Sequence, residues 1–167
     1  MTAIDAVAKE IDEYAKQATA LVIFANDINL PLNASPFYNF RDALNHYIRL
    51  YEAKEASPEY YSQMGSIREH LFRGLKDVIQ YIATDMKYRL KELADNPTID
   101  IKRKNETGKL LHKYKNFELQ LRNNAEASVI RELTPQVNTL QSLIAETFDF
   151  FDKNNLSYLK TKRSKRV

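Results

Sequence analysis

The chain has 167 residues, of which 44% are hydrophobic, and a formal net charge of +3. This length suits one domain with a substantial core. The lack of cysteine excludes disulfides, zinc–thiolate sites and cysteine nucleophiles. No apolar run approaches the ~20 residues that span a bilayer, and the early acids Asp5 and Glu10 do not fit a signal peptide. We therefore expect a soluble, cytoplasmic protein with no membrane partner.

Basic residues concentrate in two stretches. Residues 160–167 hold five cations and no acid, which leaves a net charge of −2 for the rest of the chain. We expect a single helical bundle domain over residues 1–159 and a flexible basic tail over 160–167. The tail fits phosphate binding, a localisation-like address, or simple solubility. Residues 102–115 carry six cations and one acid, so any contact with nucleic acid has to be local.

Apolar residues recur at three- and four-residue steps along most of the chain, which is typical of amphipathic helices. The stretch after Ser57-Pro58 is apolar over a wide arc until Asn96-Pro97, so we expect it to be central. Its length exceeds what a compact domain needs, which favours a kink at Gly65 or Gly74, or an extension into a partner. Residues 98–105 are expected to form a loop. The expected helices are 2–26, 35–56, 58–94, 106–131 and 134 to about 154.

These elements predict an all-α fold, an up-and-down antiparallel bundle of about five helices with one long central helix. Within it, Ser35 is expected to be an N-cap, with Pro36 at the first helical position. One stripe of the second helix is expected to face the core; it consists of Phe37, Phe40, Leu44, Tyr47, Ile48 and Tyr51.

A second, polar face of the same helix carries the candidate chemistry. It contains Asp42, Asn45, His46 and Arg49, and Arg41 lies between the two faces. Asp42 and His46 are four residues apart, so their side chains can meet. The carboxylate would then hold the imidazole in one tautomer and raise its pKa.

Arg41 and His46 also form the pattern of an arginine, four residues and a histidine. With polar Asp42 after the arginine, this resembles the RxxxxH motif of the HEPN superfamily, small all-helical bundles that include many metal-independent ribonucleases. The phrases FRDALNHYIRLYEA and REHLFRGLKDVIQY are similar to small bacterial proteins of that type, over roughly residues 36–94.

The resemblance implies an endoribonuclease that acts as a homodimer with a composite Arg/His site and no cofactor or metal. Cleaving RNA without a metal needs a base, an acid and a cation for the charge that builds on phosphorus. Arg41 would stabilise the phosphorane, His46 would transfer protons, and Asp42 and Asn45 would orient the substrate or the imidazole. RNA and a second copy are the implied partners, and a regulatory protein partner stays open.

Non-catalytic alternatives fit the same residues. The polar face with Asp42, His46 and Arg49 reads equally well as a solvated face with ordinary ion pairs. The chain would then be a helical interaction module, which buries a large apolar interface, or an inactive RNA-binding subunit.

The remaining polar candidates favour structural interpretations. We expect His70 to be a surface histidine among salt bridges with Arg68 and Glu69, and His112 to lie on a solvated face. Asp149 and Asp152 are expected on another solvated face. No histidines and carboxylates show metal-ligand spacing.

Overall fold

A computed structural model of the chain describes residues 2–27, 30, 34–123, 130–154 and 156. Over these residues the protein forms five α-helices and a short 3-10 helix, with no strand, which confirms the all-α prediction. The elements are α1 (Ala3–Asp27), α2 (Ser35–Glu52), α3 (Pro58–Ala94), α4 (Ile101–Asn123), the 3-10 helix η1 (Ile130–Leu133) and α5 (Thr134–Lys153).

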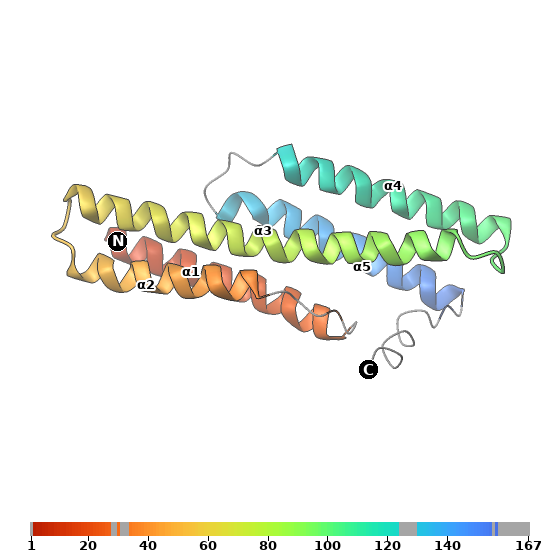
Figure 1. The fold of residues 1–167 in the computed structure, drawn as a ribbon, viewed down its shortest axis with the longest axis horizontal. Helices are drawn as coiled ribbons and strands as arrows, with labels where there is room; N and C mark the ends of the chain where they lie inside the picture. The colour runs from red at the N-terminus through yellow and green to blue at the C-terminus, as the bar shows by residue number, and fades with distance from the viewer. Residues whose placement is uncertain (1, 28–29, 31–33, 124–129, 155, 157–167) are drawn as a thin grey trace.

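The long helix α3 is the element on which the others pack (Figure 1). The Ser57 hydroxyl caps its start and accepts a hydrogen bond from the backbone N–H of Tyr60 at 3.1 Å. At about 1.5 Å per residue, its 37 residues extend for roughly 55 Å. Buried side chains nevertheless recur from Tyr60 to Leu93. The burial does not fit the alternative of an extension beyond the core. Helices α1 and α2 lie along the N-terminal part of α3, and α4 and α5 lie along its C-terminal part (Figure 1).

Helix α2 packs through a different face from the one predicted. Its buried residues are Pro36, Ala43 and Leu50, and Phe40 and Tyr47 are only partly buried against the core. The small Ala43 and the compact Pro36 allow the backbone of α2 to approach its neighbours closely. Four residues of the predicted core stripe are instead exposed; they are Phe37 at 55%, Leu44 at 38%, Ile48 at 59% and Tyr51 at 65%. We call these four the outer α2 stripe.

Two predicted helix starts also differ from the structure. The N-cap of α2 is Ala34 and not Ser35. The Ser35 hydroxyl donates a hydrogen bond to Asp77 Oδ2 at 2.6 Å. Helix α4 begins at Ile101, within the expected loop. There Asp100 Oδ1 accepts from the backbone N–H of Arg103 at 2.9 Å, which satisfies one of the free donors at the helix start.

Helices α1, α2 and α3 meet most closely at Gly74. A Cβ at this position would lie 2.8 Å from Tyr14 Oη, 3.2 Å from Asn39 Cβ and 3.4 Å from the carbonyl oxygen of Pro36. The Tyr14 hydroxyl donates to that carbonyl at 3.3 Å, and its ring stacks on Phe40. Burial raises the pKa of Tyr14 to about 12, so the hydroxyl stays protonated as a donor. This junction fixes the distance between α2 and α3, where the candidate site lies.

Polar contacts join the C-terminal part of α3 to α4, and α4 to α5. Lys87 and Thr84 of α3 both bind Glu118 of α4, and the buried hydroxyls of Tyr114 and Thr147 are 3.2 Å apart between α4 and α5. The predicted basic tail, residues 160–167, and the predicted helical continuation over 124–129 lie outside the described residues. Across the described part of the chain, no helix is long and apolar enough to cross a membrane.

Candidate functional site

Two histidines from different helices lie against each other between α2 and α3. The rings of His46 on α2 and His70 on α3 stack with centroids 5.3 Å apart and planes inclined by 21°. Both residues are half-buried. We call them the histidine pair.

Each imidazole is bound through Nδ1 to a side-chain amide oxygen. His46 Nδ1 lies 2.6 Å from Gln63 Oε1, and His70 Nδ1 lies 3.3 Å from Asn39 Oδ1. An amide oxygen accepts and cannot donate, so each Nδ1 carries the hydrogen in this arrangement. Neither Nε2 atom has a hydrogen-bond partner among the described residues. The pair therefore presents two Nε2 atoms for proton transfer.

His46 faces its own bundle, contrary to the expectation that it points away toward a second copy. The predicted contact between Asp42 and His46 is also not formed. Asp42 Oδ1 instead accepts from Arg41 Nε at 3.0 Å and from Arg41 Nη2 at 2.8 Å, because the arginine reaches the same carboxylate over a shorter path. Asn45 is exposed on the outer surface of α2. Of the four predicted site residues, His46 is the one with a hydrogen bond and a ring contact to α3 among the described residues.

Arg41 lies on a different face of α2 from the histidine pair, because five residues turn the helix by about 140° at ~100° per residue. Its guanidinium is 63% exposed, and it also lies over the Tyr38 ring at 5.2 Å from the ring centroid. A second arginine, Arg73 on α3, pairs with Glu69 on the surface. Exposed ion pairs of this kind are worth about 0–1 kcal/mol, so either guanidinium can turn toward an arriving anion at little cost.

His70 is the candidate site residue that the sequence pattern does not indicate. It lies between α2 and α3 and not among salt bridges, since Arg68 binds Glu10 across to α1 and Glu69 binds Arg73. Burial lowers the pKa of His70, and the charge of His46 lowers it further, while Asp42 opposes the shift. These surroundings therefore favour the neutral form of His70.

The spacing of the helix pair contains a signal that predicts this meeting. Only residues 53–57 connect α2 to α3, so side chains at similar distances from the connection face each other. His46 lies seven residues before it and Gln63 six residues after it. His70 is two helical turns beyond Gln63, on the same face of α3.

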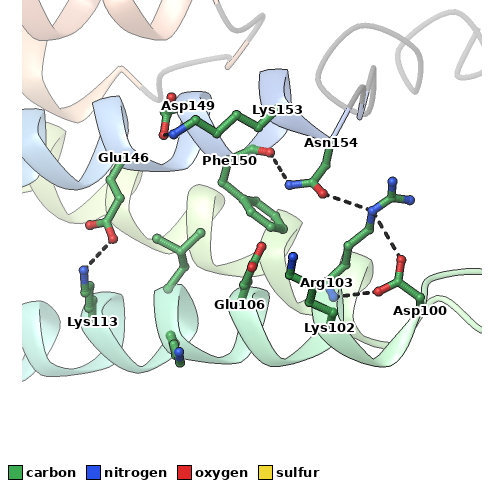
Figure 2. Close-up of a pocket in the computed structure, with 12 residues that line it drawn as sticks. Asp100, Lys102, Arg103, Glu106, Lys113, Glu146, Asp149, Phe150, Lys153 and Asn154 are labelled. Carbon is green, nitrogen blue, oxygen red and sulfur yellow. Dashed lines mark hydrogen bonds and ion pairs between the residues drawn. The ribbon is translucent and has the colours of Figure 1, made fainter.

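A second candidate is the hollow between α4 and α5, with a volume of about 640 Å³ (Figure 2). Its walls include five cations and four carboxylates. Three of those carboxylates are paired with cations of the same wall, in the pairs Lys113–Glu146, Lys153–Asp149 and Arg103–Asp100. The hollow is thus largely neutralised by its own ion pairs, and it contains no histidine or nucleophile.

The remaining predicted positions agree with their structural interpretations. His112 is exposed and accepts from Asn116 Nδ2 at 3.1 Å. Asp149 and Asp152 are exposed on α5. The described residues contain no group of three or more histidines, aspartates and glutamates that could hold a metal ion.

We compared the chain with protein-family models, curated proteins and solved structures, and none of the three comparisons gave a match.

Proposed function

We propose that this protein is a metal-independent endoribonuclease in which His46 and His70 exchange the protons of the reaction. The observation that carries the proposal is the histidine pair, with each Nδ1 bound to an amide oxygen and each Nε2 left for substrate. A base and an acid held side by side are the minimum that cleavage of RNA by its own 2′-hydroxyl requires.

The two histidines take different roles because their surroundings differ. Burial and the charge of its neighbour favour the neutral form of His70, so Nε2 of His70 takes the proton from the ribose 2′-hydroxyl as its oxygen attacks phosphorus. The bond from phosphorus to the 5′-oxygen breaks, and protonated His46 donates its Nε2 hydrogen to that leaving oxygen. The products are a 2′,3′-cyclic phosphate and a 5′-hydroxyl.

The charge that builds on phosphorus needs a cation. Arg41, the arginine of the RxxxxH-like motif, is bound to Asp42, but it lies about 140° round α2 from His46 at ~100° per residue. Arg73 lies near enough to the pair for its charge to act on His70. We assign the stabilising role to Arg73 and assign Arg41 to binding of a neighbouring phosphate. Both imidazoles come from one chain, so a second copy is not needed for proton transfer.

The test is cleavage of a 5′-labelled structured RNA by the purified protein in EDTA. We expect products that end in 2′,3′-cyclic phosphate. His46→Ala and His70→Ala should each reduce the rate by about 10²–10⁴-fold, the usual contribution of a general acid or base. His112→Ala is the matched control, because His112 is an exposed histidine on α4, and it should leave the rate unchanged. Equal rates in His70→Ala and wild type would remove the assignment.

A different observation supports a second candidate function, association through α2. The outer α2 stripe places four large apolar side chains on one exposed face, and contiguous exposed apolar surface of this kind marks interaction sites. A homodimer formed here would not join two Arg41–His46 pairs. Leu44 and Ile48 each lie two residues from His46, which is about 160° round the helix at ~100° per residue. Association and catalysis are therefore separable.

Sedimentation velocity tests this second function. If the stripe joins two copies, Ile48→Lys should convert dimer to monomer while cleavage persists. Ile101→Lys is the control, because Ile101 is 79% exposed on α4 and outside the stripe. A wild-type protein that stays monomeric at high concentration would contradict self-association.

A further inference from the structure

The side chain of Asn39 is held in one orientation by its surroundings. Its amide nitrogen donates to the Ser35 carbonyl oxygen at 3.1 Å and lies 3.4 Å from Ser35 Oγ and 3.5 Å from Asp77 Oδ2. If the amide were turned over, its oxygen would face these three oxygen atoms, including the Asp77 carboxylate. The carboxylate is itself fixed by the hydrogen bond that it accepts from the Ser35 hydroxyl at 2.6 Å. The amide oxygen of Asn39 must therefore face His70.

This orientation determines where His70 carries its hydrogen. Asn39 Oδ1 accepts only, so His70 Nδ1 must donate across the 3.3 Å that separates them. In the neutral ring the lone pair then lies on Nε2. We propose that Asn39 and Asp77 are positioning residues that lock neutral His70 in its Nδ1–H tautomer and aim a basic Nε2 at the substrate. The catalytic consequence rests on the proposed function, whereas the tautomer lock follows from the hydrogen bonds alone.

His46 lacks an equivalent lock. Gln63 Oε1 binds His46 Nδ1, but the amide nitrogen of Gln63 makes no hydrogen bond within the described part of the chain. Gln63 can therefore turn over and donate to Nδ1 when His46 changes tautomer. The fixed tautomer is therefore specific to His70.

Long-range ¹H–¹⁵N NMR of the imidazole nitrogens tests the lock directly. At pH 8 we expect wild-type His70 to show a protonated Nδ1 and an unprotonated Nε2. Asn39→Ala should give a mixture of both tautomers. Gln63→Ala, the matched control on His46, should leave His70 unchanged.

The wild-type spectrum alone can overturn the inference, so the test does not depend on any variant folding. An Nε2–H tautomer at His70, or an Asn39→Ala spectrum identical to wild type, refutes the lock. In the cleavage assay Asn39→Ala should lose about 10–100-fold in kcat/KM, the loss typical when a partner that orients a histidine is removed. If His70 carries its hydrogen on Nδ1 but the protein does not cleave RNA, the nuclease proposal is refuted and the tautomer lock is kept. If the protein cleaves RNA but His70 carries its hydrogen on Nε2, the lock is refuted and the nuclease proposal is kept.

Discussion

Gly74 gives the sharpest test of how α2 is held against α3, because the chain offers two matched controls. All three of its glycines lie inside helices. A Cβ at Gly74 would meet Tyr14 Oη at 2.8 Å and Asn39 Cβ at 3.2 Å, whereas a Cβ at Gly65 or Gly108 would have nothing within 4 Å. The same substitution to alanine should therefore have opposite effects on stability at these positions.

The expected magnitudes follow from two opposing terms. Alanine is more favourable than glycine in a helix interior by about 0.8–1.0 kcal/mol, and this should be the whole effect of Gly65→Ala and Gly108→Ala. At Gly74 the Tyr14 ring is stacked and its hydroxyl is bonded, so the clash cannot be relieved by a free side-chain rotation. Overpacking of this kind costs about 1–3 kcal/mol, and weakening the buried hydroxyl's hydrogen bond costs roughly 1 kcal/mol more. We expect Gly74→Ala to destabilise the protein by about 1–3 kcal/mol, or roughly 2–12 °C in Tm.

Urea unfolding followed by helical circular dichroism measures all three variants. A second substitution checks the cause: Tyr14→Phe removes the atom nearest to the new Cβ, so Gly74→Ala should cost at least ~1 kcal/mol less in that background. If Gly74→Ala stabilises the protein as much as Gly65→Ala does, the close approach of the three helices is wrong, and with it the geometry of Asn39 and the histidine pair.

Two further predictions concern the charges of the α1–α3 unit. The pKa of His70 in the folded protein is lowered, chiefly by burial. Below the ordinary pKa of about 6.5 the unfolded chain therefore binds more protons than the folded one, and the free energy of unfolding decreases as the pH is lowered. When the pH is lowered from 7.5 to 5.5, the wild type should lose more stability than His70→Gln. An equal loss of unfolding free energy in the two proteins, measured by urea unfolding, would contradict this. Glu10 accepts from Arg68 Nε and Nη2, with side chains only 17% and 32% exposed; Glu10→Gln should cost about 1–2 kcal/mol. The control Asp12→Asn breaks the exposed ion pair with Lys16 and should change stability by less than ~0.5 kcal/mol. If both variants lower the melting temperature equally, the partial burial of the Glu10–Arg68 pair does not strengthen it.

The sequence predicts helix α3 to its ends because its boundaries depend on local chemistry. Ser57 and Pro58 start it and Asn96-Pro97 follows it, and these signals act within a few residues. The start of α4 depends on Asp100 in the same local way. The loop predicted over residues 98–105 rests on the flanking charged residues, although lysine and arginine are good helix formers.

The face of α2 could not be predicted in this way. Its large apolar residues suggest one core stripe, but close packing selects the smaller Pro36 and Ala43 with Leu50. Hydrophobicity does not state how near two helix axes come, and the junction at Gly74 decides that distance. His46 was identified from its motif, yet its partner His70 lies 24 residues further along the chain. Only the register of α2 against α3 brings the two rings together.

The single-turnover rate of RNA cleavage in EDTA, measured for His46→Ala, His70→Ala and the double variant, tests the histidine pair most directly. Groups that act as one catalytic unit are strongly non-additive. We expect each single variant to lose most of the activity and the double variant to be no slower than the slower single one. A wild type that does not cleave RNA, or a His70→Ala variant that cleaves at the wild-type rate, would contradict the account.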